Sequence, residues 1–122
     1  METLLDANAV LRYLLEDVQE QSDVVASQVE QGAEVTLEVL AECVYVLSGV
    51  YHVDRSDIAE SLGILLDEVT CRRKCVAASA LGLYSGSSFD FVDCVLAAEA
   101  GENGREVLTF DKRLQGLIQR VG

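Results

Sequence analysis

Proline is absent from the 122 residues, histidine occurs once, and no apolar run is long enough to cross a bilayer. Because there is also no low-complexity stretch and no linker-like change in composition, we expect a single domain over residues 1–122. Glu2 and Asp6 interrupt the N-terminal residues with charge, which argues against a secretory signal. The sequence therefore predicts a cytoplasmic protein with no membrane attachment.

Basic residues are also scarce. Lys and Arg number 9 against 21 Asp and Glu, which gives a formal net charge of −12. Such a chain repels a polyanion unless a metal ion or a local basic patch intervenes, so nucleic-acid binding by charge alone is disfavoured. The excess of acids is typical of a soluble surface, or of a surface that attracts cations or a basic partner protein.

The four cysteines do not require a disulfide framework in a chain that is half hydrophobic. Cys71 and Cys75 could share a helix face, but a structural zinc needs two further ligands, and neither His52 nor the other cysteines have matching spacing. We expect reduced thiols, and His52 at the surface or in packing.

The pattern of apolar residues predicts strands alternating with helices. Short strands are expected at residues 3–5, 35–37 and 107–110, and helical spacing of apolar residues is found within 10–15, 24–32, 39–50, 54–66, 76–86, 88–100 and 112–118. Asp54 is the expected N-cap of the fourth helix, and Ser88 or Asp90 that of the sixth. Strand–helix alternation of this kind predicts an α/β fold with a central, mainly parallel sheet flanked by helices.

Four acidic residues occupy positions where such folds bind ligands. Asp6 and Asp111 each follow a predicted strand, so both are expected in the crevice at the carboxyl ends of the strands. Glu42 lies one turn into the helix after the second strand, and Asp93 lies in the first turn of the helix before the last strand. Each acid alone is better explained by helix capping or solvent exposure. Together, several like charges in one crevice predict a bound cation, and carboxylates are the ligands that Mg²⁺ or Mn²⁺ prefers.

Four segments in order, LLDANAVLRYLL, LAECVYVL, FDFVDCVLAAEA and LTFDKRL, resemble the acidic motifs of PIN-domain ribonucleases, especially VapC-type toxins. The resemblance covers nearly the whole chain. It implies a single three-layer α/β/α PIN-like domain that cleaves single-stranded RNA. It also implies that Asp6, Glu42, Asp93 and Asp111 coordinate Mg²⁺ or Mn²⁺, with Asp90 as an additional candidate ligand.

The same resemblance assigns supporting residues. Asn8 matches an asparagine that orients the first carboxylate, and Thr109 matches the hydroxyl residue before the last one. Ala7 departs from the family, which often has serine or threonine there. Three basic residues near the predicted crevice are candidates for holding RNA phosphates, or else are solvated surface cations: Arg12, Lys112 and Arg113.

Two other functions stay open at this point. A PIN-like module that binds a partner without turnover is compatible with Ala7 and with the high negative charge. A phosphotransfer domain would also place an aspartate after the first strand, but Asn8 stands where haloacid-dehalogenase phosphatases have a second acid or threonine. The expected partners are RNA, an antitoxin with a basic segment, and a second copy in a homodimer, the last two by resemblance.

Overall fold

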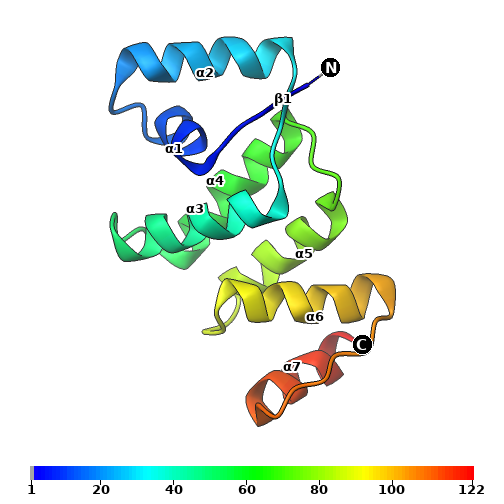
Figure 1. Ribbon diagram of the computed structural model, residues 1–122. Helices are drawn as coiled ribbons and strands as arrows, with labels where there is room; N and C mark the ends of the chain where they lie inside the picture. Colours follow the sequence, from blue (N-terminus) through cyan, green and yellow to red (C-terminus); the bar gives the residue numbers. More distant parts are fainter. Residues whose placement is uncertain (1) are drawn as a thin grey trace.

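The computed structural model describes residues 2–122, and it is mostly helical, with a small sheet in the upper part of the view in Figure 1. The elements follow the chain in the order β1 (Thr3–Leu4), α1 (Ala7–Leu15), α2 (Gln19–Gln31), β2 (Ala33–Glu34), α3 (Leu37–Gly49), α4 (Arg55–Glu68), α5 (Lys74–Ser85), α6 (Phe91–Asn103) and α7 (Lys112–Val121). Within these described residues, no helix is long and apolar enough to span a membrane.

The sheet is parallel, as predicted, and short. Strands β1 and β2 pair in the register Thr3 with Ala33 and Leu4 with Glu34. A third segment adds one parallel bridge, from Glu34 to Thr70. This third segment was not predicted, because a single bridging residue leaves no alternating pattern in the sequence.

The second strand was predicted at residues 35–37, which is wrong by two positions. The strand is Ala33–Glu34, and Thr36 already caps α3 by accepting a hydrogen bond from the Val39 amide at 3.2 Å. Val35 is fully buried and is not paired with β1. Its amide instead donates a hydrogen bond to the Thr70 carbonyl at 2.9 Å.

The predicted strand at residues 107–110 is also wrong, because this segment has no strand neighbour among the described residues. Its two large apolar side chains are almost completely exposed, Leu108 at 88% and Phe110 at 91%. Residues with a high strand propensity form a strand only where a neighbouring edge accepts them. The backbone here is extended and unpaired.

The predicted helices all form, and local chemistry sets several of their ends. Asp54 and Asp90 occupy the N-cap positions of α4 and α6 with extended backbone. Gly32 follows α2 at a φ of 127°, a conformation that a side chain would strain. Helices α4, α5 and α6 pack around fully buried residues such as Ile58, Leu62 and Phe91. The protein thus has the predicted α/β class, with a smaller sheet and more helix than expected.

Candidate metal and RNA site

Asp6 and Glu42 form the first of two acidic groups. Asp6 precedes α1 and caps it, since its Oδ1 accepts a hydrogen bond from the Ala9 amide at 2.8 Å. Glu42 is exposed on α3, which packs against α1. Burial first, and then the negative charges of Glu42 and Asp6, raise the pKa of the Cys43 thiol to about 12.

The second acidic group is formed by Asp90, Asp93 and Asp111. Asp93 is half-buried in the first turn of α6, and Asp111 caps α7 by accepting hydrogen bonds from the amides of Arg113 at 2.9 Å and Leu114 at 3.2 Å. Burial raises the pKa of Asp93, and the charges of Asp90 and Asp111 raise it further, while Arg113 lowers it. Asp93 therefore lies in a negative environment that favours a cation.

The predicted quartet is thus divided between two places. Over residues 2–122, no three or more acidic, histidine or cysteine side chains are gathered closely enough to hold a metal ion together. The prediction that Asp6 and Asp111 share a crevice depended on a strand at residues 107–110, and that strand is not formed. The available oxygen donors are of the kind that Mg²⁺ and Mn²⁺ bind, but each group alone supplies only part of a coordination shell.

Two of the predicted supporting residues lie beside these acids. Thr109 orients the second group, because its Oγ1 accepts a hydrogen bond from the Asp111 amide at 3.1 Å. Asn8 is exposed in the first turn of α1, two residues after Asp6. Ala7 is buried at 4% exposure, and its carbonyl accepts a weak hydrogen bond from the Cys43 thiol at 3.9 Å. Ala7 therefore lies where the start of α1 packs against α3.

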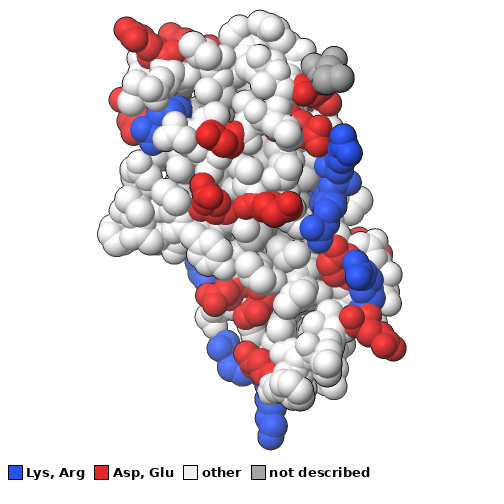
Figure 2. Space-filling model, in the orientation of Figure 1, with Lys and Arg blue, Asp and Glu red and all other residues white. Residues whose placement is uncertain are grey.

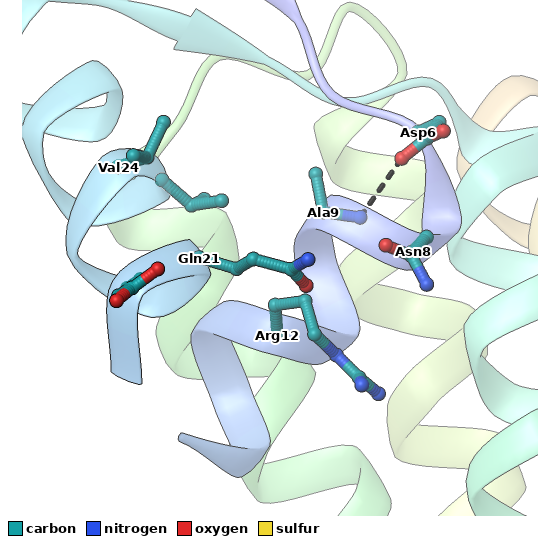
Figure 3. Close-up of a pocket in the computed structure, with 8 residues that line it drawn as sticks. Asp6, Asn8, Ala9, Arg12, Gln21 and Val24 are labelled. Atoms are coloured by element: carbon teal, nitrogen blue, oxygen red, sulfur yellow. Dashed lines mark hydrogen bonds between the residues drawn. The ribbon is translucent and has the colours of Figure 1, made fainter. Parts of the chain in front are cut away.

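Arg12 lines a hollow of about 400 Å³ that begins at Asp6 and lies between α1 and α2 (Figure 3). Its Nη1 lies 3.3 Å from an Asp17 carboxylate oxygen, and its Nη2 donates to the Tyr51 hydroxyl at 3.2 Å. The Arg12 Nε is buried and has no hydrogen-bond partner in the described part of the chain. Figure 3 shows Gln21 and Val24 of α2 on the other side of the same hollow.

The other two predicted basic residues belong to α7. Lys112 is exposed. Arg113 donates from Nη2 to the Ser88 hydroxyl at 3.0 Å, and its guanidinium carbon lies 4.7 Å from the centre of the Phe89 ring. In Figure 2, acidic side chains are spread over the visible face, whereas basic ones lie along the right side, toward the lower end where Figure 1 shows α7, and in a group at the upper left.

The sequence of the chain matches the profile of the PIN domain over residues 3–118. The chain belongs to the PIN domain family. PIN domains are generally nucleases that use divalent metal ions, and this agrees with the oxygen-rich chemistry of the two acidic groups. No curated protein and no solved structure matches this PIN domain.

Sequence reasoning missed the residues that fix the two arginines of this PIN domain. Tyr51 holds Arg12 from 39 residues away, and Ser88 holds Arg113 from 25 residues away. Gln21 in the hollow was also missed. These residues belong to no motif, and such long separations leave no periodic signal, so only the folded chain reveals them.

Proposed function

We propose that this PIN domain is a metal-dependent endoribonuclease that hydrolyses phosphodiester bonds in single-stranded RNA. The observation that carries the proposal is the environment of Asp93, which is half-buried in the first turn of α6 with Asp90 and Asp111 as charged neighbours. A carboxylate in that position is poorly stabilised on its own and is well matched to a bound cation.

In this proposal Asp6, Glu42, Asp93 and Asp111 would hold Mg²⁺ or Mn²⁺ once the two acidic groups come together, with Asp90 as an additional ligand. An ion held there would lower the pKa of a water for in-line attack on phosphorus. The products then carry 5′-phosphate and 3′-hydroxyl ends. Asn8 and Thr109 keep the first and last carboxylates oriented, in the way that neighbouring hydrogen-bonding groups tune metal ligands.

The substrate strand is held by the cations that border the acids. Arg12 lies in the hollow next to Asp6, and its unpartnered Nε is a donor that a phosphate oxygen can satisfy after a small side-chain movement. Arg113 and the exposed Lys112 lie next to Asp111 in the sequence. Local cations of this kind offset the repulsion that the net charge of −12 imposes on RNA.

The test is cleavage of end-labelled single-stranded RNAs by the purified protein with Mg²⁺, Mn²⁺ or EDTA. The matched control is Asp93→Asn, which keeps the size of the side chain and removes its charge. We expect cutting that requires both metal and Asp93. Products ending in 2′,3′-cyclic phosphate would instead indicate attack by the RNA's own hydroxyl and would refute the mechanism.

A second candidate is a binding module that keeps the PIN fold without turnover. The division of the acids into two groups favours it, because no complete coordination shell is found in residues 2–122. Metal binding measured by titration calorimetry, together with intact RNA under every metal condition, would support this module over the nuclease.

We further propose that the domain acts as the toxin of a toxin–antitoxin pair in the cytoplasm. The support is the resemblance of its acidic motifs to VapC-type toxins and the net charge of −12, which favours an antitoxin with a basic segment. Growth arrest on expression of the wild-type chain, but not of Asp93→Asn, is the expected result. Equal growth with both chains would count against the toxin role.

A further inference from the structure

The hollow between α1 and α2 contains several groups that the proposed metal chemistry does not use. Its volume of about 400 Å³ lies within the range of about 300–1,000 Å³ that is typical of small-molecule sites. Asp6 lies at one end. The walls come from both helices and include Ala9 and Arg12 of α1 and Glu20, Gln21 and Val24 of α2. The hollow therefore places polar and apolar side chains of two helices around one small space.

Arg12 is held in place at one side of the hollow. Its guanidinium is bonded to Asp17 at 3.3 Å and to the Tyr51 hydroxyl at 3.2 Å, and only 14% of its side chain is exposed. Its Nε is nevertheless buried without a hydrogen-bond partner in the described part of the chain. A buried donor without a partner is unfavourable, so this side of the hollow favours a ligand that brings an acceptor, such as a phosphate oxygen.

Gln21 projects into the hollow from the opposite side. Figure 3 shows its side chain reaching from α2 toward α1, with the amide end near Ala9 and Arg12. The other three glutamines of α2 each donate a hydrogen bond to a nearby residue: Gln19, Gln28 and Gln31. The Gln21 amide has no such partner in residues 2–122. Both its donor and its acceptor are therefore available to a ligand.

The space between the two walls is suited to a flat apolar group. Ala9 lies on the α1 wall and Val24 on the α2 wall (Figure 3), and the Val24 side chain is 69% exposed. A planar ring between these walls buries apolar surface on both of its faces. Its edge remains free to meet the Gln21 amide. A nucleobase is a ring of this kind, with two apolar faces and a hydrogen-bonding edge.

The charges around the hollow favour one kind of base. The carboxylates of Asp6 and Glu20 line the hollow, and an ionised carboxylate only accepts hydrogen bonds. They repel the carbonyl oxygens of uracil and attract the amino group of adenine. A glutamine amide also pairs with adenine through two hydrogen bonds, to N6 and N7. The side chains of the hollow therefore favour adenine over uracil.

We propose that this hollow binds an adenine nucleotide of the single-stranded RNA substrate. The base lies between Ala9 and Val24, with its N6 and N7 edge at Gln21. Its phosphate is bound by Arg12. The inference rests on the proposed function and deepens it, because it names the base that is read beside Asp6. A base in this position is unstacked from its neighbours, as is usual when proteins recognise single-stranded RNA.

The test is a titration of the isotope-labelled full chain with adenosine 5′-monophosphate or uridine 5′-monophosphate, followed by NMR in EDTA. EDTA keeps metal-dependent hydrolysis out of the measurement. Gln21→Met keeps the length of the side chain and removes its amide. The matched control is Gln19→Met, which makes the same change on the same helix at a residue that does not line the hollow. Both glutamines are exposed, so neither change should disturb folding, which circular dichroism checks.

We expect adenosine monophosphate to shift the signals of Gln21 and Val24. Its half-saturating concentration should be at least about fivefold lower than that of uridine monophosphate, the lower limit for one bidentate base contact. Gln21→Met should remove this difference, and Gln19→Met should keep it. Equal binding of the two nucleotides, an unchanged preference in Gln21→Met, or no shift at Gln21 and Val24 with either nucleotide would overturn the adenine site.

Sequencing of RNA cleavage products gives a second readout. The wild-type protein should cut with adenine at one fixed position beside the cleaved bond, and Gln21→Met should lose that preference while still requiring metal. A protein that binds adenosine monophosphate in the hollow but cuts no RNA would keep the adenine site and remove only the proposed nuclease. Cutting with the same base preference in Gln21→Met would remove the adenine site and leave the nuclease.

Discussion

Asp6 has two roles that can be separated by substitution: it caps α1, and it supplies one of the two carboxylates next to Cys43. Asp6→Ala removes both roles. The lost cap should lower the free energy of unfolding by about 1 kcal/mol. For a domain of this size that corresponds to a fall in melting temperature of about 3–6 °C.

Asp6→Asn removes only the charge, because the amide oxygen can still accept the hydrogen bond from the Ala9 amide. Its melting temperature should therefore stay close to that of the wild type. If Asp6 holds the metal ion, RNA cleavage should fall about 100-fold or more in Asp6→Asn, the scale of losing one charge interaction made in the transition state. Thermal unfolding and cleavage rates are measured on the same preparations.

Thr36→Ala is the matched control for stability. Thr36 caps α3 through a bond to the Val39 amide at 3.2 Å, so its loss should cost a similar 1 kcal/mol or so without removing a carboxylate. Cleavage by Thr36→Ala should stay near the wild-type rate below its melting temperature. The reasoning is refuted if Asp6→Asn cuts RNA normally, or if Thr36→Ala loses as much activity as Asp6→Ala.

Three further predictions follow from single contacts. At pH 8 the thiolate form of Cys43, with a pKa of about 12, is roughly one part in 10⁴, so a thiol reagent should label exposed Cys75 first, and Cys75→Ser should remove the fast phase. Arg55 donates to the carbonyls of Tyr84, at 2.8 Å, and Phe89, so Arg55→Ala should lower the free energy of unfolding by about 2–4 kcal/mol in urea titrations. Because the pKa of Asp93 is raised in the folded state, the unfolded chain loses that proton at lower pH, and metal-free stability should decline as pH rises through the raised pKa. Asp93→Asn should abolish that part of the decline in urea titrations from pH 3 to 7 in EDTA, and an unchanged pH profile would contradict it.

The helices could be predicted because each carries its own signal. Buried residues recur at helical spacing in α4, and Asp54, Asp90 and Gly32 mark ends in ways that depend only on neighbouring residues. The strands are much shorter than the helices, and their pairing depends on distant segments. Thr70 bridges to Glu34 across 36 residues of chain, and nothing near Thr70 in the sequence indicates it.

As with the fold, the sequence predicts those parts of the candidate site that depend on neighbouring residues, and not those that depend on distant ones. Asp6 and Asp111 cap helices through bonds to amides two or three residues away, so their local positions follow from the sequence. Which acids face one another depends on where the segment before Asp111 lies, and that requires a strand partner. The sequence therefore predicted the oxygen donors and not their division into two groups.

Repulsion between carboxylates explains why the acidic residues lie in two separate groups. Asp90 and Asp111 already raise the pKa of Asp93, so bringing Asp6 and Glu42 to the same place would add further repulsion unless a cation lay between them. A divalent ion between the two groups would supply the opposite charge. Metal binding should therefore stabilise the folded protein, and the melting temperature should rise when Mg²⁺ or Mn²⁺ replaces EDTA. In Asp93→Asn with Asp111→Asn that rise should be lost, whereas the metal-free melting temperature should stay close to that of the wild type or rise, because two like charges are gone.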